Sequence, residues 1–130
     1  MSYKRILLIE DEEADQRIFT IVLQSIGPGF TCTILDDAEI ALYKLETAEV
    51  SADLIFLDLR LPGMTGLEFL KELRNNETLR QTPVVVLSGV PDTNDVRETQ
   101  ELGVHDFIVK PSRYSELRTI LSSILLNSYS

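Results

Sequence analysis

Residues able to do chemistry follow four of the apolar runs in the sequence, and they are of three kinds. The carboxylates of Glu10–Glu12 come after the first run, and Asp58 comes after the third. The hydroxyl of Ser88 follows the fourth run, and the ammonium of Lys110 follows the fifth. Because ligands of open parallel sheets bind beyond the carboxyl ends of the strands, the sequence predicts that these groups share one edge of a sheet.

The chemistry that this combination favours is phosphoryl transfer with a bound cation. Carboxylates gathered from separate strands repel one another unless a cation lies among them. A small set of oxygen ligands suits Mg²⁺, which keeps several waters and binds through one or two carboxylates and phosphate oxygens. An aspartate in such a place can attack phosphorus and form an aspartyl phosphate. A metal, a lysine and a hydroxyl would supply the positioning and charge neutralisation that the transfer needs.

Each of these residues also has an ordinary structural interpretation. A carboxylate after a strand often caps the next helix, which is the simpler interpretation of Glu10 or Glu12 taken alone. A serine at a strand end commonly makes a local backbone hydrogen bond. Lys110 could be a surface lysine, and Pro62-Gly63 could be only a turn. Singly, each ordinary interpretation is at least as good. Jointly, on one edge of a sheet, the residues favour a site.

Five apolar runs and the amphipathic stretches between them must position this site. Most of the runs are unbroken and rich in Val and Ile, as strands buried on both faces should be. They are Ile6–Ile9, Phe30–Leu35, Leu54–Leu57, Val84–Leu87 and Phe107–Val109. Helical spacing links Ile18, Ile21, Val22 and Ile26; Ala38, Ala41, Leu42 and Leu45; Leu67, Leu70 and Leu73; and Leu117, Ile120, Leu121, Ile124 and Leu125. Strand then helix, five times over, predicts an α/β domain with a parallel sheet and right-handed crossovers.

The remaining helix, at 92–102, is expected to be loosely held, because Val96 and Leu102 are its only sizeable apolar anchors. No linker or repeat interrupts the 130 residues, so residues 1–130 are expected to form one domain. Its core is expected at about 4–126, followed by a frayed tail at Asn127–Ser130.

Composition argues against several classes of function. The net charge of −9 disfavours direct binding to nucleic acid, which needs clustered Lys and Arg, and it disfavours binding to anionic lipid. Cys32 is the only cysteine and is expected to be a small core residue. The apolar run Ile6–Ile9 is too short for a signal peptide, and no segment could span a bilayer. We therefore expect a cytoplasmic protein that is not bound to a membrane.

Four blocks of the sequence resemble those of bacterial two-component response-regulator receiver domains, in the same order and spacing. The blocks are Leu7–Glu12, Phe56–Gly66, Val85–Ser88 and Phe107–Pro111. The resemblance covers essentially the whole chain. It implies a flavodoxin-like, doubly wound sheet of five parallel strands in the order 2-1-3-4-5, with five helices. The resemblance is to single-domain, chemotaxis-type receivers. If the chain is complete, its phosphorylated surface itself would be the output.

Finer features are similar to receivers that partner phytochrome-like or hybrid histidine kinases. These features are the Glu10-Asp11 pair, the segment Ala14–Arg17 and the long connection Asn75–Pro83. A phosphoryl donor would accordingly be a sensor histidine kinase or a phosphotransfer protein. The chain would be a phosphoacceptor and not an enzyme, apart from its self-catalysed phosphorylation and dephosphorylation.

The resemblance also implies which residues hold the metal. Asp58 would be the phosphoacceptor, and Mg²⁺ would be the cofactor. Asp11 would be a direct ligand, and Glu10 would act mostly through metal-bound water. The carboxylate of Asp58 and the backbone carbonyl of Arg60 would complete the protein's share of the coordination.

Other positions would bind the phosphoryl group and transmit the change. Ser88 and Lys110 would each bind a phosphoryl oxygen. Ser88 would then move toward the phosphoryl group, and Phe107 would turn inward. The change would spread over helix 92–102, the fifth strand and helix Tyr114–Leu126. That surface would bind a partner, and the protein would be a monomer or a homodimer linked to phosphorylation.

Three residues depart from the usual pattern of receivers, and none of them removes a required group. Glu10 replaces the commoner Asp, and Gly89 replaces the common Ala, which gives its loop extra freedom. Arg60 is a bulky cation beside the acceptor. We hypothesise that its side chain leans over Asp58, pairs with phosphoryl oxygens and slows attack by water.

Rival functions can be weighed on named residues. A haloacid-dehalogenase-type phosphatase needs a second Asp two residues after the nucleophile, where this chain has Arg60. A flavodoxin needs a phosphate-binding loop after the first strand, where the acidic stretch Glu10–Glu13 would repel phosphate. A P-loop nucleotidase lacks its Gly-Lys-Ser/Thr motif. A purely structural interaction module leaves the acidic edge unexplained, and a Mg²⁺ titration would test it.

Overall fold

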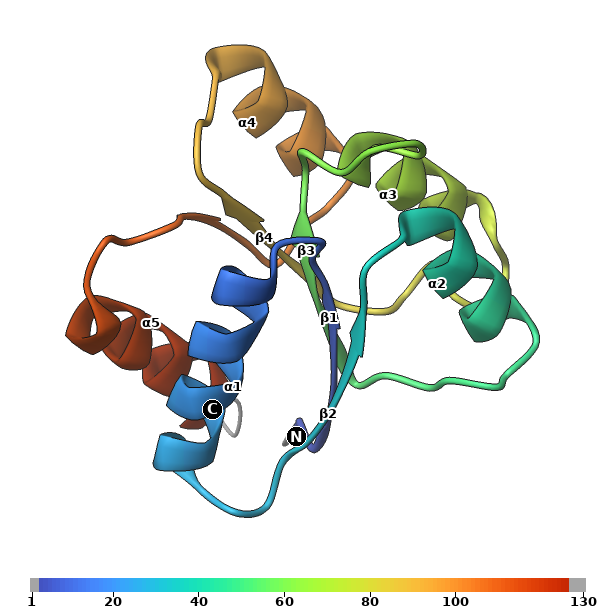
Figure 1. Ribbon diagram of the computed structural model, residues 1–130. Helices are drawn as coiled ribbons and strands as arrows, with labels where there is room; N and C mark the ends of the chain where they lie inside the picture. The colour runs from blue at the N-terminus through green and yellow to red at the C-terminus, as the bar shows by residue number, and fades with distance from the viewer. Residues whose placement is uncertain (1–2, 127–130) are drawn as a thin grey trace.

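Strands and helices alternate along the chain in the computed structural model, which describes residues 3–126 (Figure 1). The strands are β1 (Arg5–Ile9), β2 (Thr31–Leu35), β3 (Leu54–Asp58), β4 (Val84–Ser88) and β5 (Asp106–Val109). The helices are α1 (Glu13–Ile26), α2 (Ala38–Glu46), α3 (Gly66–Asn75), α4 (Thr93–Glu101) and α5 (Tyr114–Leu126). The predicted tail at 127–130 lies outside the described residues.

All five strands pair in parallel, in the order β2-β1-β3-β4-β5. This confirms the predicted α/β class and strand order. Every residue of β3 and β4 is buried, because the three central strands are covered on both faces and are built almost wholly from Val, Ile, Leu and Phe. The two edge strands, β2 and β5, contain fewer apolar residues and are partly exposed.

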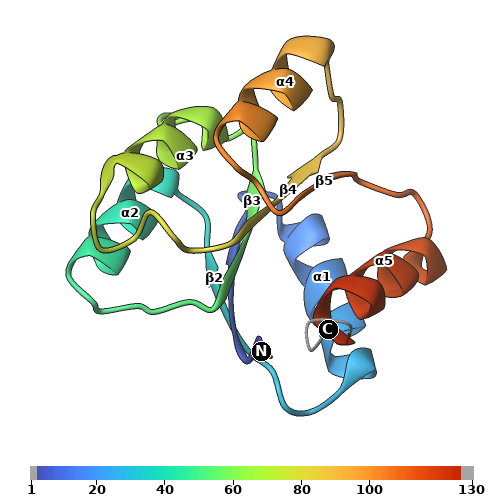
Figure 2. The same cartoon turned by 180° about the vertical axis from the view of Figure 1, so that it is seen from behind.

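Helices cover both faces of the sheet, as Figures 1 and 2 show from opposite sides. Helices α1 and α5 pack on one face around a core that includes Phe19, Phe56 and Leu121. Helices α2, α3 and α4 lie on the other face, over a second core that includes Leu57 and Phe69. This layering leaves the carboxyl ends of the strands uncovered at one edge. No helix in the described part of the chain is long and apolar enough to cross a membrane.

The apolar stripe predicted for α1 is partly wrong. Ile18 and Ile21 are 43% and 49% exposed, whereas the helix buries Phe19, Val22 and Leu23. The predictions for α2 and α5 fare better: all four α2 positions are buried, and the α5 positions are buried or half-buried.

Helix α4 has few apolar anchors, as predicted, since Thr99 is its only buried residue and Val96 is half-buried. That the helix is loosely held stays a prediction. Thr99 satisfies its own hydroxyl within the helix, by donating to the carbonyl of Asp95 at 2.8 Å. The prediction for Cys32 needs correction in part, because this residue of the edge strand β2 packs against the core but is only half-buried. Burial raises the pKa of its thiol to about 11, so it is protonated at neutral pH.

Candidate phosphoacceptor and metal site

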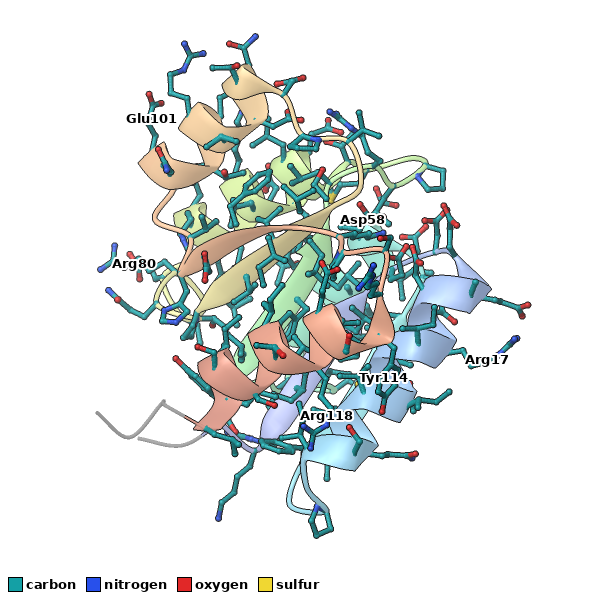
Figure 3. The ribbon with its side chains drawn as sticks, turned by 90° about the vertical axis from the view of Figure 1, so that its left-hand side faces the viewer. Arg17, Asp58, Arg80, Glu101, Tyr114 and Arg118 are labelled. Carbon is teal, nitrogen blue, oxygen red and sulfur yellow. The ribbon has the colours of Figure 1, made fainter. Side chains whose placement is uncertain are left out.

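The polar residues predicted from the strand ends meet at one edge of the sheet. Glu10 and Asp11 follow β1, Asp58 ends β3, Ser88 ends β4, and Lys110 follows β5. The parallel register continues past the strands, since the backbone N–H of Lys110 donates to the carbonyl of Ser88 at 2.8 Å. Figure 3 shows Asp58 among oxygen-bearing side chains close to the start of α1.

Three carboxylates form the centre of this site. Glu10, Asp11 and Asp58 each offer an oxygen atom, and these atoms all lie within 4.8 Å of one another. Glu10 and Asp58 are 2% and 5% exposed, whereas Asp11 is open to solvent. Burying carboxylates side by side is costly unless a cation or a donor compensates them. The all-oxygen donor set, with one side open for water, fits Mg²⁺ or a similar hard divalent ion.

The ammonium of Lys110 supplies part of this compensation. Its Nζ lies 2.7 Å from Oε1 of Glu10, 2.8 Å from Oδ2 of Asp15 and 3.4 Å from Oδ2 of Asp58. Burial acts to lower the pKa of Lys110, but its hydrogen bonds to Asp15 and Glu10 outweigh burial and raise the pKa above its ordinary value. Lys110 is therefore a permanent cation at the edge of the carboxylate cluster.

Asp15 is a member of the site that the sequence analysis did not identify. It lies in the first turn of α1, where acidic residues are common because they interact favourably with the helix dipole. Its position therefore gave no distinctive signal. Only the fold brings Lys110, 95 residues further along the chain, against it.

Glu10 is the carboxylate most affected by its surroundings. Burial raises the pKa of Glu10 to about 7, although the hydrogen bond from Lys110 opposes the shift. Its Oε2 also accepts a hydrogen bond from the backbone N–H of Glu12 at 3.2 Å. Near neutral pH the cluster can therefore take up or release a proton at this residue.

Ser88 carries a polar atom without a partner. The residue is fully buried, and its Oγ has no hydrogen-bond partner among the residues that the structure describes. Buried hydroxyls are nearly always hydrogen-bonded, so an unpartnered one at a site needs a further acceptor or donor to satisfy it. An anion held between Asp58 and Lys110 would provide such an acceptor.

Helix α3 begins directly behind the acceptor. A Cβ atom on Gly66 would lie 2.3 Å from the backbone oxygen of Asp58, so only glycine fits there. The helix start is fixed by a capping box, in which the Thr65 hydroxyl and the Glu68 carboxylate bond to each other's backbone N–H groups. Gly66 thereby joins the start of α3 closely to the acceptor segment, and its N–H donates to the carbonyl of Leu59 at 3.2 Å.

Arg60 lies beside the acceptor, but its side chain is directed to α4. Its backbone N–H donates to Oδ1 of Asp58 at 3.1 Å. Its guanidinium pairs instead with Asp95, at 2.5 Å, and with Asp92, at 3.6 Å, and donates to the carbonyl of Val90. Shielding of a phosphoryl group by Arg60 stays a prediction, and it requires the guanidinium to leave Asp95.

Phe107, the predicted switch aromatic, is half-buried in β5 and packs against the core on the α2–α4 side of the sheet. It lies one strand away from Ser88, because Val86 of β4 is its partner in register. Both residues therefore belong to the adjoining strands β4 and β5, and their role as a switch stays a prediction.

The chain is similar to known proteins both in sequence and in structure. Residues 6–122 match the sequence model of the family described as "Response regulator receiver domain". The response regulator RpfG of Xanthomonas campestris, a cyclic di-GMP phosphodiesterase, is 35% identical over 120 residues, which are 92% of this chain and 31% of that protein. The DNA-binding response regulator MtrA of Mycobacterium tuberculosis is 37% identical over 114 residues, which are 88% of this chain and 47% of that protein. The chain thus spans less than half the length of these relatives.

Solved structures with the same fold include single receivers of similar length. The phosphorylated cyanobacterial phytochrome response regulator RcpA superimposes with a TM-score of 0.87 and 32% identity, covering 98% of this chain and 96% of that one. The Mn²⁺-bound response regulator Rcp1 gives a TM-score of 0.84 and 33% identity, with 93% and 91% covered. The receiver domain of a Pseudomonas aeruginosa sensor histidine kinase, with a magnesium ion coordinated in its active site cleft, gives 0.76 and 27%, with 95% and 98% covered.

Proposed function

Because the chain belongs to the response regulator receiver domain family, we propose that Asp58 accepts a phosphoryl group in a Mg²⁺-dependent reaction of a two-component phosphorelay. The observation that carries the proposal is the arrangement around Asp58. A buried aspartate lies within a carboxylate cluster, next to the ammonium of Lys110 and close to the unpartnered hydroxyl at the end of β4. These are the groups that phosphoryl transfer to a carboxylate needs.

The chain's own residues have distinct roles in the proposed transfer. A carboxylate oxygen of Asp58 attacks phosphorus, and a new O–P bond forms as the bond to the donor breaks. The bonding electron pair leaves with the donor, which is an imidazole nitrogen of a kinase or phosphotransfer histidine, or the acetate of acetyl phosphate. Lys110 and Ser88 donate to phosphoryl oxygens, so that the incoming charge is compensated and the Ser88 hydroxyl gains its missing partner.

Glu10, Asp11, Asp58 and the backbone carbonyl of Arg60 are the proposed holders of Mg²⁺. When bound, the ion neutralises carboxylate and phosphoryl charge. Two solved relatives support this assignment, since one of them is described as Mn²⁺-bound and another holds magnesium in its active site cleft. The exposed side of the cluster at Asp11 leaves room for water ligands.

The proposed partners follow from the same assignment. A sensor histidine kinase or a phosphotransfer protein supplies the phosphoryl group, and the resemblance in structure to a phytochrome response regulator supports the phytochrome-like kinase class. We also propose that residues 1–130 act as a single cytoplasmic receiver domain, monomeric or dimerising on phosphorylation. Its signal would then be passed on by binding a protein partner through the α4–β5–α5 surface.

Intact-mass spectrometry after treatment with acetyl phosphate and MgCl₂ tests the assignment. Wild type should gain the mass of one phosphoryl group, and Asp58→Asn should gain none. Asp106→Asn is the matched control, because Asp106 is exposed and begins β5, at the opposite end of the parallel strands from Asp58. EDTA should prevent labelling while the circular dichroism spectrum keeps its folded form. Equal labelling of wild type and Asp58→Asn, or full labelling in EDTA, would contradict the proposal.

A further inference from the structure

Lys110 has a partner that belongs neither to the metal cluster nor to the acceptor. Oδ2 of Asp15 lies 2.8 Å from Nζ of Lys110, which is closer than the 3.4 Å from Nζ to Oδ2 of Asp58. The group of carboxylates that could hold an ion consists of Glu10, Asp11 and Asp58 and does not include Asp15. Asp15 therefore has no other evident role at the site than its contact with Lys110.

Counting hydrogen-bond donors shows why this contact matters. A lysine ammonium has three N–H donors. In the structure these face three carboxylates, those of Glu10, Asp15 and Asp58, and the bond to Asp58 is the longest. A phosphoryl oxygen would be a fourth claimant. Lys110 must therefore redistribute its three donors when the phosphoryl group arrives on Asp58.

Exposure indicates which partner is released. The side chain of Glu10 is 2% exposed, so its carboxylate would be left buried and uncompensated if Lys110 withdrew from it. Asp58 is 7% exposed and carries the phosphoryl group itself, so the ammonium has to stay close to it after loading. The side chain of Asp15 is 35% exposed, and water can solvate it when the ammonium leaves. Asp15 is the partner whose loss costs least.

We propose that Asp15 is a positioning residue that holds Lys110 in a resting position. Lys110 exchanges Asp15 for a phosphoryl oxygen when Asp58 is phosphorylated, which is here called the loaded state. The inference rests on the proposed function of Asp58 as acceptor. Asp15 thereby opposes the loaded state, because the energy of the Asp15–Lys110 ion pair is lost on loading. Removing the Asp15 carboxylate favours the loaded state, and it also frees Lys110 in the resting protein.

Two alanine variants separate this ion pair from a general effect of charge. Asp15→Ala removes the partner of Lys110. Glu13→Ala removes one negative charge from the same turn of α1, but Glu13 makes no contact with Lys110 among the described residues. Beryllofluoride, a mimic of the phosphoryl group, is titrated into each protein at saturating Mg²⁺. ¹⁵N NMR of the Lys110 ammonium is recorded in the metal-free proteins.

For a half-exposed ion pair we expect Asp15→Ala to bind beryllofluoride about fivefold more tightly than wild type. Glu13→Ala should bind like wild type. The Lys110 ammonium resonance should shift in metal-free Asp15→Ala and stay in place in Glu13→Ala. An equal gain in affinity in both variants would overturn the inference, since it would reflect net charge alone. An unshifted Lys110 resonance in Asp15→Ala would also overturn it, whatever the affinities. No binding of beryllofluoride by wild type or any variant would instead contradict the proposed function, and the NMR comparison would still decide whether Asp15 holds Lys110.

Discussion

Glu10 and Ser88 are the two residues at which the site departs most from an ordinary protein interior. One is a carboxylate buried to 2% exposure, and the other is a fully buried hydroxyl without a partner among the described residues. Both features cost folding free energy when no ligand is bound. They are understandable if the site is completed by a cation and an anion. Such groups stabilise the folded state by binding it and not the unfolded chain.

The raised pKa of Glu10 leads to a prediction about stability and pH. Glu10 has an ordinary pKa of 4.5 and a pKa of about 7 in the folded, metal-free protein. The folded state therefore binds this proton more tightly than the unfolded chain. Its contribution to stability is fully present below about pH 4.5 and is lost as the pH rises through about 7. Relative to Glu10→Gln, wild type should lose on the order of 1–3 kcal/mol across this window.

Urea unfolding of both proteins in EDTA, from pH 4.5 to pH 8, measures the difference. The comparison with Glu10→Gln cancels the contribution of the titrating groups that do not interact with Glu10. A free-energy difference that does not change with pH would show that the carboxyl of Glu10 is not perturbed.

The positions of the main site residues could be predicted from the sequence because each one lies at the end of an apolar run. Strand ends of a parallel sheet meet at one edge, so Asp58, Ser88 and Lys110 could be placed together without coordinates. Asp15 could not, because an acidic residue in the first turn of a helix is common for local reasons. The direction of the Arg60 side chain could not be predicted either, since it depends on where α4 begins.

Among the elements, α3 is the one most closely tied to the acceptor. Gly66→Ala would place a Cβ 2.3 Å from the carbonyl oxygen of Asp58 and 2.7 Å from Cα of Leu59. Both neighbours are backbone atoms that cannot move aside cheaply. We expect a loss of about 1–3 kcal/mol in the free energy of unfolding, and slower phosphorylation of Asp58. Chemical denaturation and mass spectrometry measure the two effects.

Gly29→Ala is the matched control, because a Cβ there meets nothing within 4 Å. Its stability should stay within about 0.5 kcal/mol of wild type. Equal stability of the two variants would mean that the start of α3 does not pack closely against the backbone of Asp58 in solution.

Helix α4 is connected to the acceptor loop by Arg60. Because Thr99 is the only buried residue of α4, the ion pair of Arg60 with Asp95 is a substantial part of what holds its first turn. Arg60→Ala should therefore increase amide hydrogen exchange in Thr93–Glu101. Global stability should change by less than about 1 kcal/mol, since the Arg60 side chain is half-exposed.

Arg97→Ala is the control, because Arg97 is an exposed arginine of the same helix with no ion pair among the described residues. Unchanged exchange in Arg60→Ala would show that the pair does not restrain the helix.

The elements themselves could be predicted from apolar runs and spacing, but the buried face of α1 could not. Apolar residues lie on two neighbouring stripes of that helix, and spacing does not choose between them. The sheet makes the choice: the ring of Phe19 packs edge-to-face on Phe56 of β3, with 5.0 Å between the ring centroids. Ile18 and Ile21 are left exposed as a result. Contacts between distant parts of the chain supply this information.

At the scale of the whole molecule, loading of Asp58 should be felt across α4, β5 and α5. This surface already exposes Val109 and Tyr114, which are 53% and 45% exposed. Phosphorylation can favour the switched conformation over the resting one only by the difference between the free energies with which the phosphoryl group interacts with the two conformations. Amide hydrogen exchange with and without beryllofluoride should change in residues 92–126. Changes confined to the surroundings of Asp11, Asp58 and Lys110 would contradict this prediction.

The strand order has a consequence for how the domain is assembled during synthesis. The first three strands of the chain pair with one another, because β1 lies between β2 and β3, and β4 and β5 then join one edge in turn. A nascent chain folded only as far as β4 already gathers Glu10, Asp11 and Asp58, yet it still lacks Lys110. Its carboxylates repel one another without the ammonium, so this partly folded state is destabilised. Docking of the last strand relieves part of the repulsion, and electrostatics thus adds to the cooperativity with which folding is completed.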